Sequence, residues 1–342
     1  SLCCLEGGYL AIASLSSHCF YLEKVREEAA KQQVLITVRQ WNQSGTSLFT
    51  TMKFASACVV LGAAFANAWV PTSQSHRSLT SLELSTAVSS DIFTKPERIV
   101  MDDLPTVYVY DHCPFCVRVR LALGIKNVKH KLYFMANDDV PTPTSLVGKK
   151  IAPIFEFPED GVVMAESMDI IELVDSDERF GTPGALKPGS GRTDLKDWQK
   201  SVQSLLRTLQ RPRYVATGLL PEFQQLDARH AFIKNHQLPP YDKPEWKEMD
   251  SDEKLQIYAE VMSSDPASMI EELNAKLVQL DDIIYSENCC TEGGLSLDDI
   301  DLWARLRSIT IIKGVVWPEK LRKYMDYLSE LGDIPLYDEL AM

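Results

Sequence analysis

The sequence predicts an α+β domain at residues 104–180 followed by an all-helical domain at residues 194–342. In the first part, short runs rich in β-branched and aromatic residues alternate with helical patterns. Residues 181–191 hold four glycines and two prolines, which disfavours any regular element, so we expect a linker at residues 181–193. Beyond the linker, the apolar residues recur with helical spacing.

The elements of the first domain follow the order β-α-β-α-β-β-α. A strand at Thr106–Tyr110 leads into a helix at Pro114–Gly124, which begins with a proline and is expected to end at its glycine. A turn at Pro158–Gly161 joins the last two strands as a hairpin. The other predicted elements are a strand at 129–134, a helix at 141–148, strands at 153–157 and 162–165, and a helix at 167–177. This order is the layout of thioredoxin-type domains.

The second domain contains one clearly marked helix start. Ser296 as N-cap and Asp299 three residues later form a capping box, and Leu295 and Ile300 form a hydrophobic staple around it. Residues 238–252 hold three prolines and charges of both signs, so we expect a surface insertion there. The predicted helices span residues 194–210, 221–235, 252–263, 266–286, 297–313 and 318–331.

Charge and cysteine content exclude several classes of protein. The chain has 342 residues and a formal net charge of −13, and the acidic excess lies after residue 100. An acidic surface repels the phosphates of nucleic acids and of anionic membranes, so neither is expected as a general partner. Half of the eight cysteines precede residue 60, and eight are too few for a disulfide framework in a chain of this length.

The N-terminal region resembles a leader that begins at Met52, the first methionine of the chain. We expect residues 1–51 to be upstream sequence that is not part of the natural product, and residues 52–103 to be a targeting region and linker. Residues 54–65 form an apolar run too short to span a bilayer, so no stable membrane insertion is expected. Ala66-Asn67-Ala68 then matches the small-x-small pattern that a signal peptidase reads.

The residues after this pattern indicate the cell compartment to which the protein is delivered. Trp69 is followed by a segment rich in hydroxyl side chains, with Glu83 as its single acid before Ser90. A signal peptide, an aromatic residue and a transit-like segment resemble the bipartite plastid-targeting leaders of algae with complex plastids. We therefore expect delivery to a plastid. The alternatives are an ordinary secretory leader, or a disordered tail on a cytoplasmic protein.

The chemistry of the chain is expected at Cys113-Pro114-Phe115-Cys116, directly after the first strand. Pro114 fits the first helical turn and places Cys113 at the N-cap, where free N–H groups and the helix dipole favour an anion. Thiols in such a place have pKa values of roughly 3.5 to 7.5 and are good nucleophiles. Cys116 lies one turn further on, within disulfide reach. Cys113 is therefore the candidate catalytic nucleophile and Cys116 the candidate resolving thiol.

A Cys-x-x-Cys pair is also half of a zinc site, or simply two core cysteines. Zinc needs two further ligands, and the other cysteines do not repeat the spacing. The strand followed by a helix favours redox chemistry, so no metal is expected. Cys289 and Cys290 are adjacent, which rarely allows a bridge, and we expect two thiols in a loop at a helix end.

Residues 106–342 also carry a family likeness. The residues are Tyr110-Asp111-His112-Cys113-Pro114-Phe115-Cys116, Gly124-Ile125-Lys126-Asn127, Asn137-Asp138-Asp139, Thr142-Pro143-Thr144, Val147-Gly148-Lys149-Lys150, Pro153-Ile154, Glu166-Ser167-Met168-Asp169-Ile170, Leu295-Ser296, Asp298-Asp299-Ile300, Leu306-Arg307, Gly314 and Trp317-Pro318. They resemble the two-domain bacterial glutaredoxins with a glutathione-transferase fold, the type called glutaredoxin two. Because the likeness extends into the helical domain, it is more specific than Cys-x-x-Cys alone.

The resemblance implies that glutathione is the co-substrate. The implied glutathione-binding residues are Pro114, Phe115, Lys150, Ala152, Pro153, Glu166 and Ser167. Pro153 would follow a cis peptide bond that lets the Ala152 backbone pair with the cysteinyl unit of glutathione. Glu166 and Ser167 would hold its γ-glutamyl end, and Lys150 its glycine carboxylate.

Each implied role has an ordinary structural alternative. Pro153 would be a trans proline that starts a strand, Ser167 a helix N-cap, and Lys150 a solvated surface lysine. The chain also departs from the family at Ala152, where valine is usual. This change keeps the backbone contact but removes side-chain packing.

The expected function is a glutathione-dependent thiol–disulfide oxidoreductase, a monomer that acts on glutathionylated proteins or small disulfides. Two alternatives share the fold or the motif. One is a glutathione transferase or an isomerase of the prostaglandin-synthase type, and the other is a non-enzymatic glutaredoxin that binds a metal or an iron–sulfur cluster.

Overall fold

The computed structural model describes residues 93–342, except residues 217, 240 and 242. All described residues belong to one compact unit. The expected upstream segment at residues 1–51 lies outside the described residues. So do Met52, the signal-like run and the transit-like segment up to residue 92.

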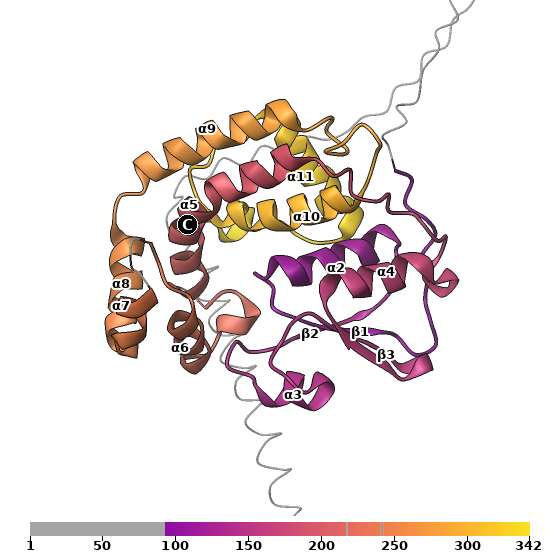
Figure 1. The fold of residues 1–342 in the computed structure, drawn as a ribbon, viewed down its shortest axis with the longest axis horizontal. Helices are drawn as coiled ribbons and strands as arrows, with labels where there is room; N and C mark the ends of the chain where they lie inside the picture. The colour runs from indigo at the N-terminus through magenta and orange to yellow at the C-terminus, as the bar shows by residue number, and fades with distance from the viewer. Residues whose placement is uncertain (1–92, 217, 240, 242) are drawn as a thin grey trace, which may run out of the picture. The chain divides into compact units, whose positions relative to one another are not determined.

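The sheet of the first domain has the strand order β2-β1-β3-β4, with β1 parallel to β2 and antiparallel to β3. Its elements are β1 (Thr106–Val109), α2 (Pro114–Ile125), β2 (Lys131–Phe134), α3 (Pro141–Val147), β3 (Ile154–Phe157), β4 (Val162–Ala165) and α4 (Ser167–Ser176). The β-α-β-α-β-β-α order expected from the sequence is confirmed. In Figure 1, α2 and α4 cover one face of the sheet, and α3 lies beyond the other.

Helix α2 is the centre of the structure, because it packs against α4 on one side and against two helices of the second domain on the other. Nearly every residue from Cys116 to Ile125 is buried, including Arg118 and Arg120. The expected end of the helix at Gly124 is one residue too early. A side chain at Gly124 would come within 2.0 Å of the Gly332 carbonyl oxygen, so this glycine permits close packing of the chain there.

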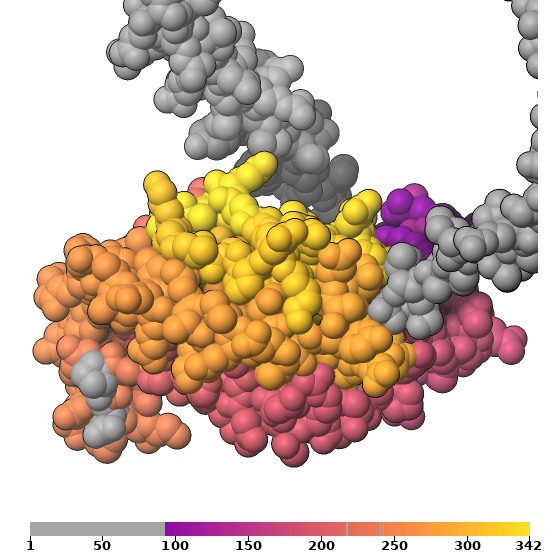
Figure 2. Space-filling model, turned by 90° about the horizontal axis from the view of Figure 1, so that it is seen from above, coloured from indigo at the N-terminus to yellow at the C-terminus, as the bar shows by residue number. Residues whose placement is uncertain are grey.

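The second domain is helical, as expected. It comprises α5 (Thr193–Ala216), α6 (Leu226–Asn235), α7 (Lys243–Glu248), α8 (Ser251–Ser263), α9 (Ala267–Ile283), α10 (Leu297–Leu306) and α11 (Glu319–Gly332). Helices α10 and α11 pack on α2. In the view of Figure 2, the later part of the helical domain, orange to yellow, forms much of the described surface.

Two predicted helices of this domain are divided in the structure. The one expected at residues 221–235 begins with a separate 3₁₀ turn, Pro221–Phe223, before α6. The one expected at residues 297–313 passes into a second 3₁₀ turn, Arg307–Ile311. Apolar spacing alone does not distinguish a helix from a helix preceded or followed by a tighter turn. Both turns carry charged residues that reach the first domain.

The surface position expected for residues 238–252 is largely confirmed, because most of the described residues of this segment are exposed. Leu238, however, is fully buried and Trp246, on α7, is 3% exposed. The Trp246 indole N–H donates to the Ile233 carbonyl oxygen at 2.9 Å. Two apolar side chains therefore anchor an otherwise solvated segment to the core of the helical domain.

Residues 93–103 were expected to be linker, but part of this segment is paired with the first domain. The Ile99 N–H donates to the Asn127 carbonyl oxygen at 3.0 Å, and its carbonyl accepts from Lys129 N–H at 2.8 Å. Phe93 N–H donates to the Tyr327 hydroxyl at 3.0 Å. Isolated contacts of this kind leave no periodic pattern in the sequence, so they could not be anticipated.

The linker expected at residues 181–193 has no helix or strand before α5 begins at Thr193. It is nevertheless hydrogen-bonded to the helical domain. The Lys187 N–H donates to the Leu295 carbonyl oxygen at 3.2 Å, and the Lys187 carbonyl oxygen accepts from the Leu297 N–H at 3.0 Å.

Within the described residues, none of the helices has the length and apolar character that a membrane crossing requires.

Candidate active site

Cys113 stands where the first strand turns into α2. It is the N-cap of that helix, with extended backbone (φ −76°, ψ 117°), and Pro114 follows as the first helical residue. The N–H groups of Phe115 and Cys116, at the start of the helix, favour a negative charge on its sulfur. Cys113 is partly exposed and Phe115 is 46% exposed, whereas Cys116 is fully buried. The site thus presents one accessible sulfur, backed by a second beneath it.

The two thiols have opposite acidities. The pKa of Cys113 is lowered to about 6, first by a hydrogen bond from the Cys116 thiol and then, against the effect of burial, by the charge of His112 and the amide N–H groups of α2. Burial and the neighbouring Cys113 raise the pKa of Cys116. At neutral pH Cys113 is therefore a thiolate and Cys116 a hydrogen-bond donor to it, as a nucleophile and a resolving thiol require.

The sheet gathers the other predicted site residues at the edge where β1 ends. Tyr108 in β1 pairs with Ile154 in β3, and Ile154 pairs with Ala165 in β4. The residues after β1, before β3 and after β4 therefore share one edge of the sheet. The Ala152–Pro153 peptide bond is cis, as expected. Pro153 is buried and Ala152 partly exposed.

Glu166 and Ser167 follow β4 at this edge, but their local roles differ from the expected ones. The N-cap of α4 is Glu166, at a φ of 76°, and Ser167 is the first helical residue, 6% exposed. The alternative that made Ser167 the N-cap is therefore wrong. Glu166 holds a positive φ that few residues other than glycine adopt, and such strain is often found at functional sites.

The two lysines of the loop before β3 lie differently. Lys149 Nζ is 3.5 Å from Glu166 Oε1, and both side chains are 61% exposed. Lys150, the residue implied by the family, donates from Nζ to the Asn137 carbonyl oxygen. Both lysines are exposed, so both ammonium groups are available to an anionic ligand at the sheet edge.

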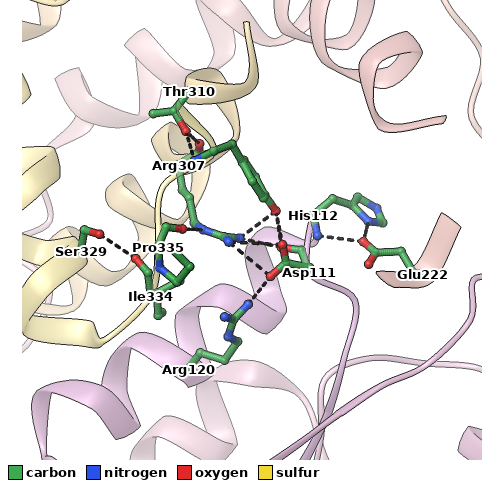
Figure 3. A network of polar contacts seen from close by, with 10 residues as sticks. Asp111, His112, Arg120, Glu222, Arg307, Thr310, Ser329, Ile334 and Pro335 are labelled. Atoms are coloured by element: carbon green, nitrogen blue, oxygen red, sulfur yellow. Dashed lines mark hydrogen bonds and ion pairs between the residues drawn. The ribbon is translucent and has the colours of Figure 1, made fainter. Parts of the chain in front are cut away.

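A buried network around Asp111 was missed from the sequence. Arg307, from the second 3₁₀ turn, donates to the Asp111 carbonyl oxygen at 2.8 Å and to both carboxylate oxygens at 3.2 Å. Arg120 and Tyr337 complete it at 2.5 and 2.7 Å. Figure 3 shows Asp111 between the two arginines. Burial acts to raise the pKa of Asp111, but the guanidinium groups outweigh it and hold it at about 2. The segment before Cys113 is thereby anchored to the helical domain.

His112 makes a second contact with the helical domain. Its backbone N–H donates to Glu222 Oε1 at 2.9 Å, and its ring Nδ1 lies 2.5 Å from the same oxygen (Figure 3). Glu222 belongs to the 3₁₀ turn Pro221–Phe223 and is fully buried. One weak signal for both networks is present in the sequence: two polar residues, Asp111 and His112, stand directly before the Cys-x-x-Cys pair.

Two further cysteines, Cys289 and Cys290, lie in the described part of the chain. Within the described part of the chain, His, Cys, Asp and Glu side chains form no cluster of three that could hold a metal ion. Cys289 and Cys290 follow α9 and are fully buried, with Cys290 N–H donating to Asp299 Oδ1 at 2.6 Å. Burial raises the pKa of the Cys290 thiol far above neutral, so this thiol is unreactive at pH 7.

The comparisons with known proteins agree with this geometry. Residues 194–341 match the family model of the glutaredoxin 2 C-terminal domain, and residues 112–177 match that of the glutathione S-transferase N-terminal domain. Glutaredoxin 2 of Escherichia coli K12 is 32% identical over 236 residues, covering 69% of this chain and 99% of the relative. A crystal structure of Salmonella typhimurium glutaredoxin 2 in complex with glutathione is 32% identical, with a TM-score of 0.58, and the match covers 70% of this chain and 100% of that one. The chain therefore belongs to the glutaredoxin 2 family.

Proposed function

We propose that this protein is a glutathione-dependent thiol–disulfide oxidoreductase that reduces glutathione mixed disulfides at Cys113. The observation that carries the proposal is the pair of unequal thiols at the start of α2, in a chain of the glutaredoxin 2 family. The match of the helical domain to that family favours disulfide exchange over the transferase and isomerase alternatives, which share only the fold.

The reaction follows from the two acidities. The Cys113 thiolate attacks the glutathione sulfur of a mixed disulfide, that S–S bond breaks, and the substrate leaves as a thiolate that takes a proton from water. Cys113 is then joined to glutathione. A second glutathione thiolate attacks the glutathione sulfur of this adduct and releases glutathione disulfide. Alternatively, Cys116 loses its proton and attacks the Cys113 sulfur, which releases glutathione and leaves a Cys113–Cys116 disulfide that two further glutathione molecules reduce, with release of glutathione disulfide.

We propose that glutathione binds along the sheet edge beside Cys113. The exposed ring of Phe115, the first turn after Pro114, and the backbone of Ala152 beside Pro153 would hold its cysteinyl unit. Glu166 would pair with its ammonium group, and the Ser167 hydroxyl and the N–H groups that begin α4 would donate hydrogen bonds to its γ-glutamyl carboxylate. Lys150 would pair with its glycine carboxylate. A glutathione complex of a relative at 32% identity supports this site.

The activity is tested by turnover of a small glutathione mixed disulfide, coupled to glutathione reductase. We expect saturable turnover that requires glutathione. An absorption spectrum of the freshly purified protein tests the alternative of an iron–sulfur protein. Absence of turnover in a correctly folded protein, or a visible cluster spectrum, would overturn the proposed function.

The glutathione site gives a second prediction. In a protein with Cys113 replaced by serine, which cannot exchange disulfides, Ser167→Ala and Glu166→Gln should each weaken glutathione binding by about 1.5–3 kcal/mol, or roughly ten- to a hundredfold. Isothermal titration measures this. Glu172→Gln removes the same charge from an exposed position on α4 and should leave affinity unchanged. If all three variants bind glutathione as tightly as the Cys113→Ser protein does, Glu166 and Ser167 do not belong to the site.

We also propose substrates, assembly and location for the enzyme. Glutathionylated proteins and small disulfides are the proposed substrates, and a monomer the proposed assembly, with no nucleic acid as a partner.

Plastid delivery is supported by the composition of residues 52–90, which resembles a bipartite leader. A fluorescent protein fused behind residues 52–103 tests the location. Fluorescence confined to the cytoplasm or to secretory compartments would contradict plastid delivery.

A further inference from the structure

Glu222 is a buried carboxylate that the exchange steps above leave without a role. Its exposed fraction is 0%. Its Oε1 accepts from both the backbone and the ring of His112, 110 residues away in sequence. Its Oε2 has no hydrogen-bond partner among the residues that the structure describes. A buried carboxylate with one unpaired oxygen is costly unless a cation lies against it, and the ring of His112 is in that position.

The surroundings of His112 isolate this pair from water. The rings of Tyr214, Phe223 and Phe232 lie with their centroids 5.1, 5.0 and 5.3 Å from the imidazole. The His112 side chain itself is only 13% exposed. Charge interactions are screened less in such an apolar enclosure than at the surface, so a charge on His112 acts strongly on its neighbours.

The charge on His112 depends on Glu222. Burial alone lowers the pKa of His112, but the hydrogen bond and the negative charge of Glu222 outweigh it, and the pKa is raised above its ordinary value. Glu222 therefore favours the imidazolium form of His112. His112 immediately precedes Cys113 in the chain, and its charge is one of the causes that lower the Cys113 pKa.

The other titratable groups around this pair keep one charge state between pH 5 and 8. The pKa of His236 is lowered to about 4 by burial, so it is neutral, and the pKa of Asp111 is about 2, so it is ionised. Burial raises the pKa of the other groups near the pair, which therefore stay neutral: Tyr110, Cys116, Tyr214 and Tyr337. Cys113, whose pKa is lowered to about 6, therefore changes charge in that range, beside a ring whose protonated form Glu222 favours.

We propose that Glu222 and His112 form a positioning pair, through which the helical domain holds an imidazolium beside Cys113 and keeps its sulfur charged in mild acid. The inference deepens the proposed function, because it concerns the nucleophile of that reaction. Neither residue exchanges a bond with substrate. Glu222 acts through His112, and His112 acts through its charge.

The test is the pH dependence of Cys113 alkylation by iodoacetamide, followed by peptide mass spectrometry. In Glu222→Gln, His112 loses its counter-charge, and its burial then favours the neutral ring. The midpoint pH of Cys113 alkylation should therefore rise by about one unit. Alkylation at pH 6 should then fall about fivefold, whereas at pH 8.5 it should stay the same or increase, since a more basic thiolate is more nucleophilic. Glu248→Gln, an exposed change on α7, controls for overall charge and should give the wild-type curve.

A second variant separates this role from a general loss of structure. His112→Gln should raise the midpoint by a similar amount, and the double variant should add nothing to His112→Gln, because both changes remove the same cation. A lower rate at every pH, additive shifts, or an unchanged midpoint in Glu222→Gln would each overturn the proposal. If Glu222→Gln does not fold, His112→Gln decides, since an unchanged midpoint there excludes the pair.

The alkylation needs no glutathione, so it is independent of the proposed activity. A shifted midpoint in a protein without turnover would refute the enzyme function and keep the pair. Turnover with an unshifted midpoint would support the enzyme function and refute the pair.

Discussion

Cys113→Ser is expected to abolish turnover of glutathione mixed disulfides, a fall of at least about a thousandfold. A serine oxygen cannot form the mixed disulfide, and among the cysteines that the structure describes no other thiol is placed to take over. Cys116 is fully buried with a raised pKa, and Cys289 and Cys290 are buried beyond α9. The coupled glutathione reductase assay, run at equal protein concentrations, measures the effect.

Cys116→Ser is the matched comparison. The glutathione route needs one thiol, and a serine hydroxyl can still donate a hydrogen bond to the Cys113 sulfur, so this variant should keep or exceed the wild-type rate. Cys113→Ser with substantial activity, or inactivity confined to Cys116→Ser, would reverse the assignment of nucleophile and resolving thiol.

Arg307→Met is expected to lower the free energy of unfolding by about 3–5 kcal/mol, the largest stability effect we predict. Arg307 is 2% exposed and donates to Asp111, to the Tyr337 hydroxyl at 2.8 Å and to the Pro335 carbonyl oxygen at 2.9 Å. Methionine fills much of the same volume but leaves the Asp111 carboxylate with Arg120 and Tyr337 alone and removes several hydrogen bonds at once. Urea unfolding measures the loss.

Arg305→Met serves as the control for this change. Arg305 lies two residues earlier, 36% exposed, and pairs with Asp301 at 3.2 Å one helical turn away. The pair is partly exposed, and Asp301 keeps its contacts with Arg118 and Gln199 in this variant, so the expected loss is at most about 1 kcal/mol. If the two variants lose similar small amounts of stability, the network at Asp111 is not what joins the first domain to the second.

The part of the site that the sequence predicts well is the part built from neighbours in the chain. Cys113, Pro114 and Cys116 share one strand-to-helix turn. Local rules for helix starts are enough to predict that the pKa of Cys113 is lowered. The order of strands and helices was predictable for the same reason. Each element carries its own period, and the turns between them carry glycine or proline.

The part that could not be predicted depends on contacts across the chain. Glu222 reaches His112 over 110 positions, and Arg307 reaches Asp111 over 196. Both reside in 3₁₀ turns that the apolar pattern did not separate from the adjacent helices. Residues 238–252 are a related case. Their charges correctly indicated an exposed segment, but no local pattern showed that Leu238 and Trp246 would be buried beneath it.

The most direct test of this account is to trap the intermediate. The Cys116→Ser protein, mixed with glutathione disulfide and digested without reductant, should carry glutathione on the peptide that contains Cys113. The yield should fall as the pH is lowered through about 6, where the Cys113 thiolate is protonated. Glutathione found on another cysteine, or no adduct at any pH in a folded protein, would contradict the account.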